Sequence, residues 1–252
     1  MSDRQRGGLI GATLSALIGI AILCGLGVWQ LERKVWKENL IATLTARLTR
    51  APEPLPPPAQ WPRLTQAADE YSRVSFTAEF LAGQEALVYT AGSAFRPDVQ
   101  GPGYWVLAPA KLAGGDIVLV DRGFVPAERK DTASRAQGTP QGTVDIVGVM
   151  RWPETPGLFT PAAEPQNNVW YARDSAAIAA AKTWDTAAPF YIEQEAPVLP
   201  GGLPKPGRLV VALPDNHLQY AITWFGLALA LAGVYGVWLS GRLRRRLPMP
   251  SP

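Results

Sequence analysis

Two uncharged stretches decide the fold: GGLIGATLSALIGIAILCGLGVWQL at Gly7–Leu31 and LQYAITWFGLALALAGVYGVWLSG at Leu218–Gly241. They are 25 and 24 residues long, and about 20 helical residues cross the hydrocarbon core of a bilayer. The first stretch is longer than the apolar region of a cleaved signal peptide, which has about 7–15 residues. No Ala-x-Ala site ends it. We therefore predict a membrane protein with transmembrane helices at residues 9–31 and 217–239.

Basic residues orient these two helices, because cytoplasmic flanks carry an excess of Lys and Arg. Arg242 and residues 244–246 follow the second stretch, against Lys205 and Arg208 before it. The C-terminus is thus predicted to be cytoplasmic, and with two spans the N-terminus is as well. Residues 1–8 form a cytoplasmic N-tail and residues 240–252 a basic cytoplasmic C-tail. Residues 32–216 form an extracytoplasmic domain, which is periplasmic in a bacterium.

Strand patterns dominate this middle domain. Val74, Phe76, Ala78 and Phe80 alternate with polar residues, which is the period of a half-buried strand. Further strands are predicted at 86–90, 104–108, 117–125, 144–150 and 190–193, and a helix at 175–182. The first of these further strands is expected to pair with the strand before it. We predict an α+β domain, mainly antiparallel, with about six strands and one or two helices.

The segments that join the domain to the membrane helices have their own patterns. Apolar residues at every fourth position from Trp36 to Leu48 predict that the first helix continues to Thr49–Ala51. Six prolines in Ala51–Pro62 predict an extended linker. A second stretch rich in Pro and Gly, Pro197–Gly207, leads back toward the membrane.

Composition excludes several classes of function. Cys24 is the only cysteine, so an intrachain disulfide, a Cys-x-x-Cys-His haem attachment and a Cys-rich metal site are excluded. The net charge of +3 lies mostly at the chain ends and gives no sign of nucleic acid binding. Asp121, Glu154 and Asp174 are candidate acids, but nothing in the sequence pairs them. We expect surface or turn roles for them, and no catalytic residue.

His217, the only histidine, is the strongest candidate site residue. In a helix, Tyr220 and Trp224 lie at i+3 and i+7 from it, on nearly the same face. Haem iron takes an axial imidazole, so this face suits a flat apolar ligand with an iron centre. The other interpretation is that His217 caps the helix at the membrane interface. Trp29 and Trp224 lie near predicted membrane boundaries, where an aromatic belt is also expected.

Several segments resemble, in order, the Surfeit locus protein 1 (Shy-type) family of cytochrome oxidase assembly factors. The resemblance covers about Leu26 to Leu239, including the two-anchor architecture. The segments that carry it are Leu26–Arg33 with Trp36-Lys37, Gly101–Tyr104, Val118–Pro126, Pro156–Pro161, Trp170–Asp174 and Asn216–Phe225.

This resemblance implies a non-enzymatic role in building haem-copper terminal oxidases. Bacterial members are similar in binding haem a, and the matching positions here are His217 as the iron ligand and Trp224 beside it. Tyr220 and Trp29 are expected to pack the porphyrin. The implied cofactor is haem a, bound transiently. The implied partners are the catalytic subunit of a haem-copper oxidase, the haem a synthase and the lipid membrane. The implied location is a bacterial plasma membrane.

Two other hypotheses stay open at this point. In the first, the domain is a haem-free scaffold that stabilises an oxidase assembly intermediate. Its interaction surface would include the Pro-rich arms and the strand end at Arg122–Pro126. In the second, the domain is an enzyme of the outer face, such as a hydrolase, although the sequence offers no nucleophile-base pair and no metal set.

Overall fold

The computed structural model describes residues 3–93, 95–185, 188–211 and 215–244. The chain forms two units: Met1–Ala42 with Leu213–Pro252, called here the helix pair, and Thr43–Ala212, the barrel unit. Helix α1 (Asp3–Thr49) runs from the first unit into the second. Arg245 and Arg246, two of the basic residues that support the predicted orientation, lie outside the described residues.

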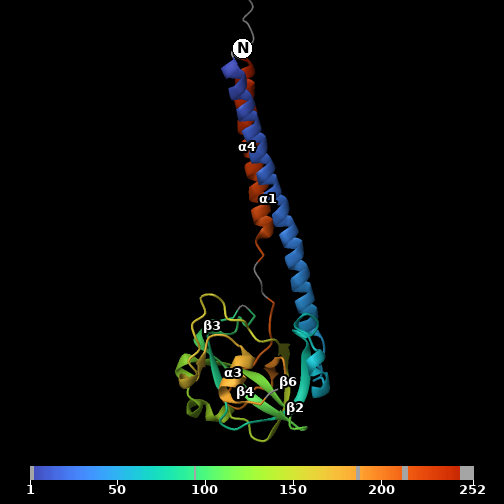
Figure 1. Cartoon of the computed structure of the whole chain (residues 1–252), viewed down its shortest axis with the longest axis vertical. Coiled ribbons are helices and arrows are strands. Elements are labelled where there is room, and N and C mark those ends of the chain that lie inside the picture. Colours follow the sequence, from blue (N-terminus) through green and yellow to red (C-terminus); the bar gives the residue numbers. More distant parts are fainter. Residues whose placement is uncertain (1–2, 94, 186–187, 212–214, 245–252) are drawn as a thin grey trace, which may run out of the picture. The chain divides into compact units, whose positions relative to one another are not determined.

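The helix pair consists of α1 and α4 (His217–Arg244), which run antiparallel (Figure 1). Thr13 Oγ1 and the Tyr235 hydroxyl oxygen are 2.6 Å apart. At Gly27 the helices approach so closely that a Cβ atom would lie 2.7 Å from the Phe225 ring. Both helices are long and apolar enough to cross a membrane. Two long apolar helices are therefore present where the sequence predicts them, and α1 continues to Thr49 as predicted.

Five strands of the barrel unit close into a ring. In order around the ring they are β2 (Arg73–Phe80), β6 (Thr143–Arg151), β8 (Tyr191–Ala196), β5 (Ile117–Pro126) and β4 (Gln100–Leu112). The end of β4 returns to β2 through the register Ala78↔Leu112 to Phe80↔Ala110, which completes the barrel. Only β5 and β8 are parallel neighbours in this ring of described strands.

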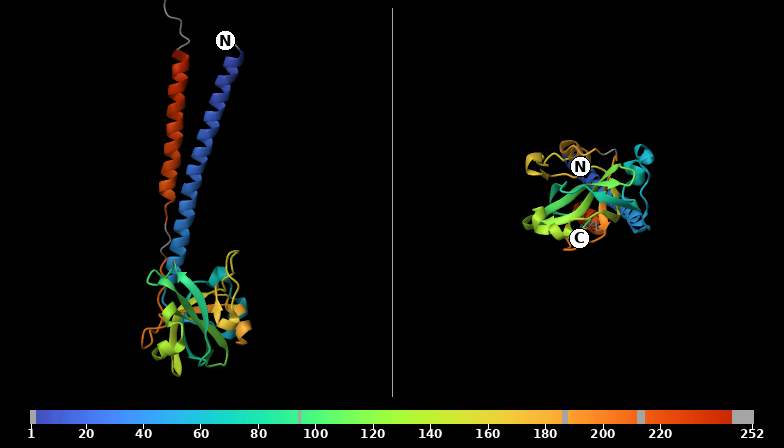
Figure 2. Two further views of the ribbon diagram at one scale, coloured as in Figure 1. Left: turned by 90° about the vertical axis from the view of Figure 1, so that its left-hand side faces the viewer. Right: turned by 90° about the horizontal axis from the view of Figure 1, so that it is seen from below.

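Three further strands extend this sheet. Strand β3 (Ala86–Gly92) pairs with the first half of β4, and short β7 (Val169–Trp170) pairs with β3. Short β1 (Glu53–Pro54) lies beside β2. The predicted strand at 86–90 is confirmed, but its partner is β4 and not β2. The prediction of a mainly antiparallel α+β domain with few helices is confirmed (Figure 2).

The strands bury apolar residues on both faces, which explains why nearly the whole of β5 is buried. Side chains from all five barrel strands fill the interior, among them Val74, Ala110, Val120, Ile146 and Ile192. A second cluster lies outside the ring beneath helix α3 (Ser175–Lys182), which has the predicted bounds. Trp105, Leu119, Trp170, Ile178 and Tyr191 belong to this second cluster.

The prediction of a linker at Ala51–Pro62 is wrong. This segment contains β1 and most of the short helix η1 (Pro58–Arg63), and α2 (Gln66–Asp69) follows it. Trp61 is 1% exposed and packs edge-on against Phe190 in the barrel interior. Its indole N–H donates to the Pro56 carbonyl oxygen at 2.8 Å. Trp61 therefore anchors this Pro-rich segment against the barrel core.

The strand end at Arg122–Pro126 is also not the free surface that the scaffold hypothesis predicts. Residues 121–125 are all buried. The segment at 197–207, which follows β8 and is called here the returning chain, covers them. In it, Lys205 exchanges two backbone hydrogen bonds with Phe124, at 3.1 and 2.7 Å. At Gly123, which has a φ of +113°, a Cβ atom would lie 2.1 Å from the Lys205 carbonyl oxygen. Only glycine fits this approach and this φ angle.

Three short helices complete the barrel unit: η2 (Ala127–Arg129), η3 (Thr132–Gly138) and η4 (Pro165–Asn167). Arg96 is fully buried and fastens the returning chain to the barrel unit. Its guanidinium group pairs with Asp98 at 2.8 Å and donates to the carbonyl oxygens of residues 205–207, at 3.3–3.4 Å.

Candidate functional site

His217 begins helix α4, and the residues before it prepare that start. The Tyr220 amide donates to the Asn216 carbonyl oxygen at 3.1 Å, the first turn of the helix. The Asp215 carboxylate accepts from the His217 amide at 3.1 Å. A carboxylate at this position satisfies a free amide and faces the positive end of the helix dipole. The imidazole is thus held at a defined helix end.

The imidazole has one polar partner on the other helix. His217 Nδ1 lies 2.7 Å from the Gln30 side-chain oxygen on α1. An amide oxygen accepts a hydrogen bond, so Nδ1 carries the proton and donates. In this tautomer Nε2 keeps its lone pair, and among the described residues no hydrogen bond engages it. The contact therefore orients the ring and leaves one nitrogen open to a ligand.

The other three predicted site residues take no part in this hydrogen bond. Tyr220 is 54% exposed and Trp29 is 52% exposed, while Trp224 is half-buried. Among the described residues, no hydrogen bond or pair of stacked aromatic rings joins these three side chains to His217. The structure therefore brings His217 together with Gln30, which the sequence prediction missed. A polar amide in an otherwise apolar membrane stretch is itself a signal of function.

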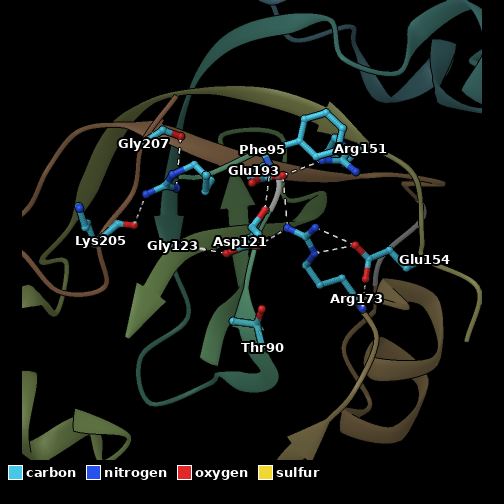
Figure 3. Close-up of polar contacts among 12 residues, drawn as sticks. Thr90, Phe95, Asp121, Gly123, Arg151, Glu154, Arg173, Glu193, Lys205 and Gly207 are labelled. Carbon is cyan, nitrogen blue, oxygen red and sulfur yellow. Dashed lines mark hydrogen bonds and ion pairs between the residues drawn. The ribbon is translucent and has the colours of Figure 1, made fainter. Parts of the chain in front are cut away.

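A second cluster of polar residues lies in the barrel unit, around Arg173 (Figure 3). Arg173 contacts three carboxylates: Asp121 at 3.3 Å, Glu154 at 2.7 Å and Glu193 at 3.3 Å. Glu193 also pairs with Arg151 at 2.9 Å. The Gly123 amide donates to the Asp121 carboxylate at 3.0 Å. We call these five residues, Asp121, Arg151, Glu154, Arg173 and Glu193, the ionic network.

The network overturns the prediction that nothing pairs Asp121 and Glu154. Asp121 is completely buried, and Arg173 joins it to Glu154. Sequence spacing missed the pair because Asp121 lies on β5 while Arg173 precedes α3, 52 positions later. The turn role of Asp174 is confirmed: its carboxylate accepts from the Ala177 amide at 3.0 Å and caps α3.

Burial dominates the electrostatics of Asp121. Loss of solvent, opposed by Arg173 and reinforced by Glu193, raises the pKa of Asp121 to about 7. Burial also disfavours the charged form of Arg173, yet Tyr191 and the three carboxylates raise its pKa. Each carboxylate of the network has an arginine partner within 3.3 Å. We therefore interpret the network as part of the structure of the barrel unit. No cluster of three or more metal-binding side chains occurs among the described residues.

Comparison with known proteins identifies the family to which this chain belongs. The model of the SURF1 family matches residues 17–229. The chain belongs to the SURF1 family. The SURF1-like protein of Monosiga brevicollis is 36% identical over 266 aligned positions, covering 100% of this chain and 95% of that protein. Surfeit locus protein 1 of Homo sapiens is 35% identical, covering 82% of this chain and 70% of its own length. The protein of the same name in Rattus norvegicus is 34% identical.

The SURF1 family match includes both parts of the molecule described above. Residues 17–229 contain Gln30 and His217 of the helix pair and all five residues of the ionic network. The resemblance seen in the sequence is therefore confirmed at the level of the family. The names of the SURF1 relatives state no ligand, so the role of His217 rests on its geometry.

Proposed function

We propose that this chain is a non-enzymatic assembly factor for a haem-copper terminal oxidase, such as cytochrome c oxidase. It binds haem a on the helix pair and passes it to the catalytic subunit. Membership of the SURF1 family supports the oxidase role. The observation that carries the haem proposal is the His217–Gln30 contact, because it fixes the imidazole and leaves Nε2 open.

The residues of the helix pair fit such a cofactor. An imidazole with a free Nε2 is a ligand of haem iron, and the bound haem would supply the redox centre of the future oxidase. Tyr220 and Trp29 expose about half of their aromatic surface, enough for a porphyrin face to pack against. Trp224 lies two helical turns below His217 on α4. His217 would hold the iron, and these three aromatic residues would hold the ring.

The chain also suits transient binding. His217 is the only histidine, so it supplies a single imidazole. A haem held by one imidazole would be easier to release to an acceptor than a haem held by two. Gln30 orients the imidazole from the side of Nδ1, away from the nitrogen that would bind the iron.

We further propose a bacterial plasma membrane as the location, with both termini cytoplasmic and the barrel unit periplasmic. The basic C-terminal flank supports this orientation. The haem a synthase would be the source of haem, and the catalytic subunit would be the acceptor. The haem site at the start of α4 then lies near the outer face of the membrane.

The test is a pyridine haemochrome spectrum of the full chain, co-expressed with haem a synthesis and purified in detergent. The expected result is haem a near stoichiometric in the wild type and absent in His217→Ala. Leu218→Ala, at the next position on α4 and 49% exposed in the wild type, is the matched control and keeps its haem. A folded, monodisperse wild type without haem would instead support the haem-free scaffold.

A further inference from the structure

The most exposed large apolar side chains among the described residues lie at one tip of the barrel unit. Leu158 and Phe159 are each 93% exposed. They belong to the segment between β6 and η4, which projects from the barrel unit as the yellow loop in Figure 2. This is also the Pro156–Pro161 motif of the sequence, which the proposed haem site does not use. Two neighbouring apolar side chains at this exposure indicate a binding surface.

The tip is a closed turn and presents both side chains outward. The Thr160 amide donates to the Gly157 carbonyl oxygen at 3.0 Å, and the Gly157 amide donates to the Thr160 hydroxyl at 2.9 Å. Leu158 and Phe159 occupy the two corners of this turn. Corners of turns ordinarily carry Gly, Pro, Asn, Asp or Ser. Turn formation therefore does not explain these two residues.

Both ends of the segment are fixed to the barrel unit. At one end, Glu154 and Arg173 are joined through two backbone amides and the guanidinium group, at 2.7–3.1 Å. At the other end, Glu164 pairs with Val169 through the backbone and accepts from Asn167 and the Tyr171 hydroxyl. The fixed ends and the closed turn restrict the tip, so less order is lost when it binds.

The chemistry of the segment favours lipid over a protein surface. Residues 155–163 carry no charge, and Pro156 and Pro161 remove two backbone donors. The flanking Glu154 and Glu164 lie at the base of the segment, where Glu154 pairs with Arg173 and Glu164 accepts from Asn167 and the Tyr171 hydroxyl. Protein interfaces surround their apolar centre with polar groups that form hydrogen bonds, and this tip offers few. Both ends of the barrel unit also continue toward helices able to cross a membrane, which keeps lipid at high effective concentration.

We propose that Leu158 and Phe159 insert into the outer surface of the bilayer and give the barrel unit a third attachment to the membrane. The occupant is the boundary between headgroups and acyl chains of uncharged lipid. This inference stands on the exposure and the turn, and does not require haem binding.

The experiment is a depth measurement on the full chain in phosphatidylcholine vesicles. In a Cys24→Ala background, a nitroxide spin label is attached to Phe159→Cys, and its accessibility to oxygen and to a water-soluble nickel chelate is compared. We expect a depth of about 5–10 Å below the phosphates, as for other interfacial apolar groups. The matched control is Val198→Cys, which is 67% exposed in another loop of the barrel unit and should remain in water.

Two results would overturn the proposal. One is a label at position 159 that is as accessible to the nickel chelate as the label at 198. The other is protection that appears only after the oxidase catalytic subunit is added to the vesicles, which would assign the tip to a protein partner. Leu158→Ser with Phe159→Ser should melt at the wild-type temperature, since neither side chain is buried, and should shift the label at a neighbouring Thr155→Cys toward water.

Discussion

The helix pair and the barrel unit use polar residues in opposite ways. In the helix pair, the His217 imidazole contacts the Gln30 side-chain oxygen and keeps a ring nitrogen open. In the barrel unit, Asp121 and Glu193 of the ionic network are buried and Glu154 is partly exposed, and each carboxylate faces an arginine. A polar contact that leaves an atom without a partner indicates a ligand site, whereas a network closed on itself indicates structure. The predictions below test this difference, beginning with the largest expected effect.

Removal of Arg173 tests the structural role of the network most severely. Arg173→Ala leaves Asp121 and Glu154 without their arginine, and we expect the free energy of unfolding of the barrel unit to fall by about 3–5 kcal/mol. Chemical denaturation of the full chain in detergent measures this loss. Arg63→Ala, at an exposed position on η1, should change it by less than about 0.5 kcal/mol. Equal effects of the two variants would contradict the structural role.

The raised pKa of Asp121 gives the network a pH dependence of known sign. The folded state holds a proton on Asp121 up to about pH 7, whereas the ordinary value is 3.8. The folded state therefore binds more protons between these values, and stability should decrease as the pH rises through this window. Asp121→Asn should flatten the decrease, while Asp116→Asn should not. The measurement is the free energy of unfolding at a series of pH values from 4 to 8, and parallel curves for wild type and Asp121→Asn would refute the assignment.

Much of the fold could be predicted from the sequence, because its signals are local. Uncharged stretches predict the two long helices, and apolar patterns predict six of the eight strands among the described residues to within a few residues. The Pro-rich segment has the composition of a linker, so the sequence predicts one. In the structure a single residue, Trp61, anchors the segment to the core. The turn after β2 is a local signal, and it predicts that β3 pairs with β2. In the structure β3 pairs with β4 instead, and the far end of β4 pairs with β2 to close the barrel, which no local signal shows.

The site was only partly predictable. His217 is conspicuous as the only histidine at the start of an apolar helix. Gln30 is 187 positions away and becomes its partner only when the helices pair. Asp121 and Arg173 likewise meet only through the packing of the loop before α3 against β5. In both places the sequence supplies one member of a pair, and tertiary structure chooses the other.

Substitution of Gln30 tests whether haem binding at His217 Nε2 depends on the contact between His217 Nδ1 and Gln30. Gln30→Leu removes the acceptor that orients His217, and we expect haem a to bind about 10–100-fold more weakly, as for other residues that orient metal ligands. Titration of the purified apoprotein with haem a, followed by absorbance, measures the affinity. Gln219→Leu makes the same change at an exposed position of α4 and should leave the affinity unchanged. If both variants bind as the wild type does, Gln30 has no part in the site.

The cap of α3 is a local contact and should have a smaller effect than the network beside it. Asp174→Ala removes the acceptor for the Ala177 amide, and we expect a loss of about 1 kcal/mol in the free energy of unfolding. Asp174→Asn keeps an acceptor and should restore most of the stability. A loss as large as that of Arg173→Ala would mean that Asp174 belongs to the ionic network.

The smallest effect on the free energy of unfolding should come from substitution of His217, the proposed iron ligand. His217→Ala removes the iron ligand, but the contacts that its side chain makes among the described residues lie within the helix pair. The barrel unit has its own closed core, so its free energy of unfolding in the apoprotein should change by less than about 0.5 kcal/mol. The measurement is the denaturation experiment used for Arg173→Ala. A loss of several kcal/mol would show that the imidazole is part of the structure in the same way as the network. A stable protein without haem would instead separate the two uses of polar residues that this molecule combines.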